Sequence, residues 1–91
     1  MKQVVIVGRE NCTFCKQAVQ TCNQKGISFS YKTIHEDITL EQVEVIAGGK
    51  VSSVPQIYIS EDGLNTYIGG FTDFRKYLET NETLTESRQV I

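Results

Sequence analysis

The 91-residue sequence contains no tryptophan, one proline, one histidine and only three cysteines. It also lacks any apolar run close to the ~20 residues that a membrane-spanning helix requires. An odd and clustered set of cysteines argues against the disulfide framework of a small secreted domain. The net charge of −2 provides no basic face for nucleic acid. We therefore expect a soluble, cytosolic (cytoplasmic) protein that binds neither membrane nor nucleic acid.

The length and composition favour one compact domain. A chain of this size has room for a single core, and its 40 % apolar and 22 % charged residues are ordinary for a globular protein. The apolar run from Val4 to Val7 is too short for an export signal and is typical of a strand buried on both faces. We place the domain at residues 1–80 and a polar C-terminal tail at residues 81–91.

Three segments carry apolar residues at helical spacing. The first helix has Cys15, Ala18, Val19 and Cys22 on one face and ends at Gly26. The second helix is indicated by an apolar stripe of Leu40, Val43 and Ala47 after a capping box formed by Thr39 and Gln42. The third is indicated by a stripe of Phe74, Tyr77 and Leu78 after a cap at Thr72.

The remaining strands follow from alternation and from turn residues. Residues 27–33 alternate apolar and polar side chains, which indicates a second strand. A third strand follows Pro55, and Asp62-Gly63 is a hairpin signal before a fourth. The predicted order is β-α-β-α-β-β-α, with Cys12 and Cys15 where the first strand meets the first helix. This is the α/β thioredoxin-like fold, a central four-stranded mixed sheet flanked by three helices.

The Cys12-x-x-Cys15 pair is the strongest chemical signal in the sequence. Cys12 stands where the first helix begins, so its sulfur faces backbone N–H groups without intrahelical partners and the positive end of the helix dipole. Both favour the thiolate, and the pKa of a cysteine in such a place falls from ~8.5 to as low as ~3.5. Cys15 returns to the same side one turn later, more buried and within reach of a disulfide. Cys15 can therefore act as a resolving thiol.

A metal site is the alternative interpretation of the pair. A mononuclear zinc site usually needs two further ligands, and no second cysteine pair exists. Cys22 and His35 are the other strong candidates. We interpret Cys22 as a small buried apolar residue, with catalysis as its alternative, and His35 as a solvated loop residue without a role. The sequence therefore favours redox chemistry, and we predict no metal ligands.

With these residues identified, the chain resembles the dithiol glutaredoxins, most closely the short bacterial and phage forms that donate electrons to ribonucleotide reductase. The resemblance covers about residues 3–80 and depends on three motifs in register, GRENCTFC at 8–15, SVPQI at 53–57 and IGGFTDF at 68–74. Thioredoxin itself fits less well, because the tryptophan before its first cysteine is absent. The resemblance implies a monomeric oxidoreductase that uses glutathione to reduce protein disulfides and glutathione mixed disulfides. Cys12 is then the nucleophile, and ribonucleotide reductase is a candidate partner.

The resemblance also implies a glutathione site. Pro55 is expected in the cis form, which turns the backbone of Val54 toward the cysteinyl part of glutathione. Arg9 matches the basic position for the glycyl carboxylate. The N–H groups at the start of the third helix would hold the γ-glutamyl carboxylate, and Asp73 the ammonium group. The expected substrate-binding set is Arg9, Thr13, Phe14, Ser53, Val54, Pro55, Gly70, Thr72 and Asp73.

These residues also have purely structural interpretations. Arg9 fits a solvated charge at a strand end, and Phe14 fits a partly exposed apolar contact. Thr72 and Asp73 fit a helix cap, and Gly70 a turn. The Val54-Pro55 step fits a rigid start of a strand.

Two departures from the commonest family motif keep other functions open. Thr13 and Phe14 stand where the family usually has proline and tyrosine. Glutaredoxins with a smaller residue in place of that proline sometimes bind a [2Fe–2S] cluster between two subunits with glutathione as a ligand. A glutathione-ligated [2Fe–2S] carrier is therefore the alternative function. A thioredoxin-like interaction module without redox activity is a third.

Overall fold

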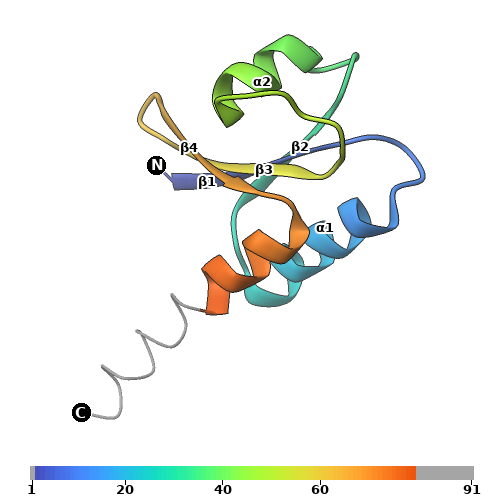
Figure 1. Ribbon diagram of the computed structural model, residues 1–91. Helices are drawn as coiled ribbons and strands as arrows, with labels where there is room; N and C mark the ends of the chain where they lie inside the picture. Colours follow the sequence, from blue (N-terminus) through green and yellow to red (C-terminus); the bar gives the residue numbers. More distant parts are fainter. Residues whose placement is uncertain (1, 80–91) are drawn as a thin grey trace.

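The computed structural model describes residues 2–79, which form a four-stranded mixed sheet with helices on both faces (Figure 1). Its elements are β1 (Lys2–Gly8), α1 (Thr13–Lys25), β2 (Phe29–Thr33), α2 (Leu40–Ala47), β3 (Gln56–Glu61), β4 (Leu64–Gly69) and a C-terminal helix at residues 71–79. The predicted element order and fold class are confirmed. The predicted tail at 81–91 lies outside the described residues, and the domain boundary stays a prediction.

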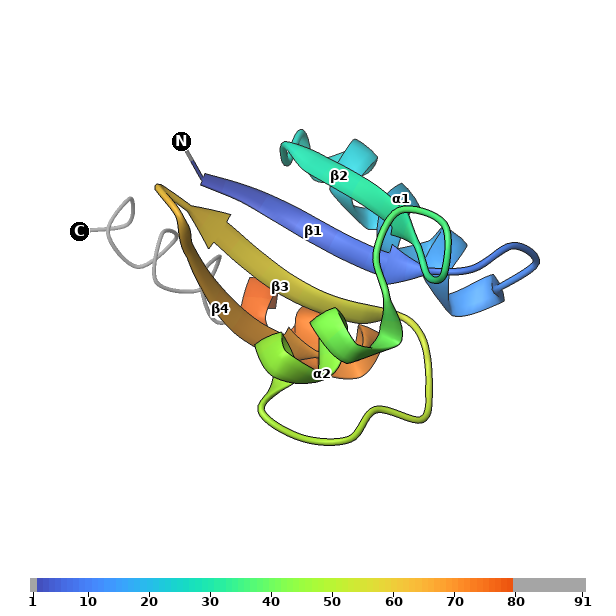
Figure 2. The ribbon, with the colours of Figure 1, turned by 90° about the horizontal axis from the view of Figure 1, so that it is seen from above.

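The sheet has the strand order β2-β1-β3-β4 (Figure 2). β1 pairs in parallel with β2, where Ile6 lies opposite Tyr31, and antiparallel with β3, where Ile6 lies opposite Ile57. Because β1 has a neighbour on each side, its apolar run lies in the interior of the sheet, as expected. The turn between β3 and β4 has positive φ angles of 51° at Asp62 and 87° at Gly63, so the hairpin signal is confirmed.

The sheet separates two hydrophobic cores. Successive side chains of a strand point to opposite faces, so Val4 and Ile6 belong to one core and Val5 and Val7 to the other. α1 and the C-terminal helix cover the first face, and α2 covers the second (Figure 1). The first core comprises Val4, Ile6, Ala18, Cys22, Ile57, Ile59, Phe74 and Leu78. The second comprises Val5, Val7, Ile38, Val43 and Tyr58.

The helix ends follow the predicted local signals. Gly26 and Gly48 end α1 and α2 in the left-handed conformation, with φ angles of 66° and 79°. At the start of α2, Thr39 and Gln42 form both hydrogen bonds of a capping box. These two helices are therefore bounded by short-range interactions that the sequence displays directly.

Two predictions need correction. The second strand begins at Phe29 rather than at residue 27, and its side chains are uniformly half-buried rather than alternating. β2 lies at the edge of the sheet, so neither of its faces is fully covered. The C-terminal helix begins at residue 71, and the N–H group of Phe74 donates to the carbonyl of Gly70 at 3.0 Å. Thr72 therefore lies in the first turn and not at the N-cap.

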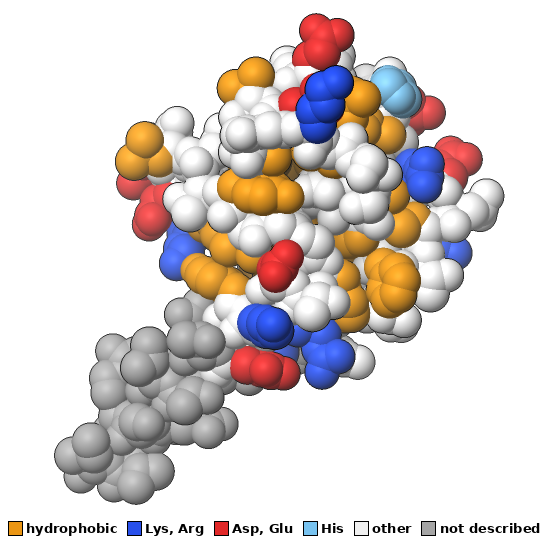
Figure 3. All heavy atoms as spheres, in the orientation of Figure 1, with side chains coloured by type: hydrophobic (Ala, Val, Ile, Leu, Met, Phe, Trp, Pro, Cys, Tyr) orange, Lys and Arg blue, Asp and Glu red, His pale blue; other side chains and the backbone are white. Residues whose placement is uncertain are grey.

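In the view of Figure 3, charged and apolar side chains are scattered over the surface, and the apolar ones do not form one continuous patch. Among the described residues, the large hydrophobic side chains most open to solvent are Val45, Leu64 and Phe14, with exposed fractions of 82 %, 75 % and 57 %. Among residues 2–79, no helix is long and apolar enough to span a membrane. Of the three, Phe14 lies between the two cysteines of the pair in the sequence.

Candidate active site at the start of α1

A tight turn after β1 places Cys12 at the start of α1. Asn11 adopts a left-handed conformation with φ of 58°, which asparagine tolerates better than most residues. Cys12 is the N-cap residue, and its sulfur accepts a hydrogen bond from the backbone N–H of Cys15 at 3.2 Å. The predicted position of the Cys12 sulfur, facing the free N–H groups of the helix, is thus present in the structure.

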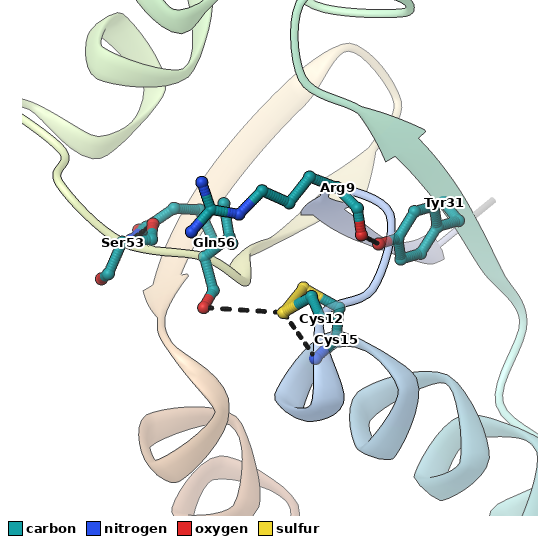
Figure 4. The surroundings of a disulfide bond; sticks show 7 residues. Arg9, Cys12, Cys15, Tyr31, Ser53 and Gln56 are labelled. Carbon is teal, nitrogen blue, oxygen red and sulfur yellow. Dashed lines mark hydrogen bonds between the residues drawn. A yellow bond between two sulfur atoms is a disulfide. The ribbon is translucent and has the colours of Figure 1, made fainter.

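Cys12 and Cys15 form a disulfide, with their Cα atoms 5.2 Å apart (Figure 4). The two cysteines differ in accessibility, because Cys12 is half-buried and Cys15 has no exposed surface. An attacking thiolate can therefore approach Cys12, whereas Cys15 is covered. This asymmetry matches the predicted division into an outer and an inner thiol.

The Val54-Pro55 segment, which precedes β3, also lies beside the disulfide. The peptide bond before Pro55 is cis, as the resemblance implied. The carbonyl oxygen of Val54 lies 4.0 Å from the Cys12 sulfur. Pro55 is buried, while Ser53 is exposed at the rim. The backbone of this segment therefore stands beside the sulfur that a substrate would reach first.

Gln56 anchors this segment from within the molecule. It is the one buried polar side chain among residues 2–79, with 6 % of its surface exposed. Its Nε2 atom donates to the carbonyl of Ser53 at 2.8 Å, and its Oε1 atom accepts from the Tyr67 hydroxyl. Burial and the nearby negative charge of Asp73 raise the pKa of Tyr67, so its hydroxyl keeps the proton that it donates.

Arg9 follows β1, and its side chain and its backbone carbonyl extend to different parts of the site. Its side chain extends past the disulfide toward Ser53, as Figure 4 shows. At the other end of the residue, its carbonyl accepts a hydrogen bond of 3.0 Å from the Tyr31 hydroxyl on β2. The guanidinium group therefore extends toward the Ser53 side of the site and is exposed to an anionic ligand there.

The start of the C-terminal helix forms a further side of the site. Gly69 has φ of 127°, and a Cβ atom there would lie 3.0 Å from the Asp73 carboxyl carbon, so this carboxylate folds back over Gly69. A Cβ atom on Gly70 would lie 3.7 Å from the carbonyl oxygen of Pro55. The helix start is therefore adjacent to the cis proline, and Thr72 and Asp73 are exposed in its first turn.

Phe14 joins α1 to the C-terminal helix at the surface. Its ring centroid is 6.0 Å from that of Phe71, and the Arg75 guanidinium lies 6.0 Å from the Phe71 ring on the same helix. A hollow of about 370 Å³ extends from Phe14 and Phe71 to Thr72. Thr13 is exposed in the first turn of α1. Phe71 was not among the predicted site residues, although it lies within the third motif.

Cys22 and His35 lie apart from this chemistry. Cys22 is a free thiol without exposed surface, and burial raises its pKa to about 11, so its interpretation as a small core residue is confirmed. His35 is exposed in a turn, as expected for a loop residue. Within residues 2–79, no group of three or more histidine, cysteine or acidic residues is arranged to hold a metal ion.

Comparisons with known proteins agree with this arrangement. The family described as Glutaredoxin matches residues 4–64. A glutaredoxin of Vibrio cholerae is 40 % identical over 84 residues, covering 86 % of this chain and 92 % of that protein. Glutaredoxin 1 of Escherichia coli is 33 % identical over 85 residues, covering 87 % and 95 %. The solved structure of reduced E. coli glutaredoxin has a TM-score of 0.73 at 33 % identity and covers 89 % of this chain and 98 % of its own.

The chain belongs to the glutaredoxin family. It is a thiol–disulfide oxidoreductase with a thioredoxin-like fold and a redox-active cysteine pair, Cys12 and Cys15.

Proposed function

We propose that the protein uses glutathione to reduce protein disulfides and glutathione mixed disulfides, with Cys12 as nucleophile and Cys15 as resolving thiol. The observation that carries this proposal is the position of the Cys12 sulfur. It accepts the Cys15 N–H at the start of α1 and lies 4.0 Å from the Val54 carbonyl beside the cis proline. A hydrogen bond from a helix N-terminus stabilises an anion, so this placement favours the thiolate form of Cys12.

Substrate reduction proceeds in two displacements. The Cys12 thiolate attacks one sulfur of the substrate disulfide, and the bonding electron pair leaves with the other sulfur. For a protein disulfide, Cys15 then attacks Cys12, which releases the second substrate thiol and forms the Cys12–Cys15 disulfide. The Cα separation of 5.2 Å supports this second step, since it is within the range for a disulfide.

Glutathione then restores the dithiol. Its thiolate attacks the more accessible Cys12 sulfur, forming a mixed disulfide while Cys15 leaves as a thiolate. A second glutathione thiolate attacks the sulfur of the bound glutathione, so glutathione disulfide departs and Cys12 regains its electron pair. Two electrons pass from two glutathione molecules to the protein. The potentials of glutaredoxins, about −200 to −230 mV, lie close enough to the cytosolic glutathione couple for this direction.

We place the glutathione moiety along the residues around Cys12. The backbone of Val54 would pair with its cysteinyl part, and Arg9 would attract its glycyl carboxylate. The helix start at Thr72 and the Asp73 carboxylate would bind the carboxylate and ammonium of the γ-glutamyl end. The other residues proposed to line this seat are Thr13, Phe14, Ser53, Pro55 and Gly70. The exposed Arg9 and Asp73 side chains support this orientation because they provide opposite charges for the two ends.

The proposal extends to partners and compartment. A reduced glutathione pool is characteristic of the cytoplasm, where we place the reaction. Ribonucleotide reductase is the candidate protein substrate suggested by the resemblance to short bacterial and phage glutaredoxins. The protein is proposed to act as a monomer.

The decisive assay is glutathione-dependent reduction of a small glutathione mixed disulfide, coupled to NADPH through glutathione reductase. We expect Cys12→Ser to reduce turnover by more than about 100-fold, because the attacking thiolate is lost. Cys15→Ser should retain this activity, since glutathione itself can resolve the intermediate, and should lose reduction of a protein disulfide.

Cys22→Ala is the matched control because Cys22 is on the same helix but buried away from the site. Its turnover should stay within about twofold of the parent, with folding checked by circular dichroism. Equal turnover in Cys12→Ser and the parent would contradict the proposal, as would a parent protein without glutathione-dependent activity.

A further inference from the structure

When the disulfide is reduced, the inner sulfur, that of Cys15, becomes negatively charged in a buried position, whereas the outer sulfur of Cys12 is accessible to solvent. The mechanism above, on which this inference rests, makes Cys15 leave as a thiolate when glutathione attacks Cys12. Cys15 has no exposed surface, so water cannot solvate that charge directly. A buried anion without a hydrogen-bond donor is strongly disfavoured. A donor near the Cys15 sulfur would therefore favour the reduced state.

The contacts around Gly8 identify such a donor. A Cβ atom on Gly8 would lie 2.7 Å from the Cys15 sulfur and 2.9 Å from Cζ of Tyr31, and it would be closer still to the Tyr31 hydroxyl oxygen. The phenol group and the inner sulfur are therefore neighbours over the same glycine. Any larger residue at position 8 would fill the space that they share.

The Tyr31 hydroxyl has the properties required of this donor. It now donates to the Arg9 carbonyl at 3.0 Å, which shows that its proton is directed to the end of β1. Burial raises the pKa of Tyr31 above its ordinary value of 10.0, so the group is protonated at neutral pH. The Arg9 carbonyl is next to exposed backbone and can accept from water when the phenol turns away.

Other charged groups lie farther out around a neighbouring hollow. This hollow, of about 580 Å³, is lined by Tyr31 together with Arg9, Glu10 and Lys16. Cys12 on α1 is bonded to the Cys15 sulfur, and Tyr31 on β2 is the titratable group that shares the space over Gly8 with that sulfur. Tyr31 therefore borders both the space over Gly8 and this hollow.

We propose that Tyr31 stabilises the Cys15 thiolate by turning its O–H from the Arg9 carbonyl to the Cys15 sulfur when the disulfide is reduced. The S–S bond breaks, its electron pair stays on the Cys15 sulfur, and the new S–S bond joins glutathione to Cys12. Tyr31 keeps its proton and only changes its acceptor. When Cys15 later attacks in the opposite direction, the hydrogen bond returns to Arg9.

The test is a pH titration of the reduced protein by NMR, with ¹³Cβ-labelled cysteine so that Cys12, Cys15 and Cys22 are followed separately. We expect Tyr31→Phe to raise the pKa of Cys15 by about one unit, a tenfold lower thiolate-to-thiol ratio at a given pH. Tyr58→Phe is the matched control, because Tyr58 is a buried tyrosine of the second core, on the other face of the sheet. It should leave the Cys15 titration unchanged.

An unchanged Cys15 titration in folded Tyr31→Phe would overturn the proposal, and so would an equal shift in both variants. Because the titration needs no substrate, it can fail while glutathione-dependent turnover persists. The parent protein provides a second test that does not depend on a variant. The ¹³Cζ resonance of Tyr31 should shift between the oxidised and reduced forms, as its acceptor changes from oxygen to sulfur, whereas that of Tyr58 should not. An unshifted Tyr31 resonance would equally overturn it.

Discussion

The hydrogen bonds that hold the two sides of the disulfide join residues at different separations in the sequence. On the helix side, the Cys12 sulfur is bound by an N–H group three residues away, at the cap of α1. On the proline side, the Ser53 carbonyl is bound by Gln56, which in turn accepts a hydrogen bond from Tyr67 on β4, eleven residues farther along the chain. One side depends on a local helix cap and the other on a side-chain network that links the proline segment to the sheet.

This difference separates the reactivity of the sulfur from recognition of its substrate. The helix cap acts directly on Cys12 and needs no other part of the molecule. The Val54 carbonyl lies beside the sulfur, and Gln56, itself bound by Tyr67, holds the carbonyl of the preceding residue. Changes on the helix side should therefore affect stability or the chemistry of sulfur, and changes on the proline side should affect substrate affinity.

Replacing Gly8 by alanine, at the end of β1 and against the Cys15 sulfur, should have the largest effect. The added methyl group would lie 2.7 Å from the Cys15 sulfur and still closer to the Tyr31 hydroxyl. Overpacking of this kind costs about 1 to 3 kcal/mol, so we expect the free energy of unfolding to fall by roughly that amount. Urea denaturation of the oxidised protein measures it.

Gly49→Ala is the matched control for this substitution. A Cβ atom there would meet nothing within 4 Å, and the residue has no positive φ. We expect its stability to change by less than about 0.5 kcal/mol. Similar losses in the two variants would show that Gly8 does not hold Tyr31 and Cys15 in the arrangement described.

On the proline side, Gln56→Leu should weaken substrate binding more than turnover. The leucine keeps most of the side-chain volume but removes the donor to the Ser53 carbonyl and the acceptor of the Tyr67 hydroxyl. Each such hydrogen bond contributes about 0.5 to 1.5 kcal/mol. We expect KM for the glutathione mixed disulfide to rise about fivefold to tenfold and kcat to change less than about twofold. Steady-state kinetics at saturating glutathione separate the two constants.

Tyr67→Phe should produce a smaller change in the same direction, because it removes only the outer hydrogen bond of this network. Gln24→Leu is the control, since Gln24 is an exposed glutamine of α1, and it should leave KM unchanged. A loss of kcat at constant KM in Gln56→Leu would contradict the assignment of this side to substrate affinity.

Most of the fold and the helix side could be predicted because they depend on short-range signals. The cap at Cys12, the capping box at Thr39 and the hairpin at Asp62 each involve residues at most three positions apart. The buried strand β1 followed from a continuous apolar run. Family motifs added the cis form of Pro55, for which the chain itself offers only a proline in a suitable place.

The hydrogen bonds of Tyr31 and Tyr67 depend on contacts between residues far apart in the sequence. At Gln56 the sequence pattern indicates only a strand residue, although a single polar side chain directly after proline and before an apolar run is a weak signal of a buried anchor. Tyr31 and Tyr67 alternate with other strand residues in no distinctive way. Their hydroxyl partners became visible only once the register of the sheet was fixed. Thr72 was misplaced because a threonine near a helix start resembles a cap whether or not the helix begins after it.

The most direct test of the account is to trap its central intermediate. The Cys15→Ser variant, incubated with glutathione disulfide, should accumulate one glutathione per chain, and peptide mapping by mass spectrometry should locate it on Cys12 and not on the buried Cys22. That result would show that the outer sulfur at the start of α1 carries the exchange with glutathione. Glutathione on Cys22, or none on the protein, would contradict the account.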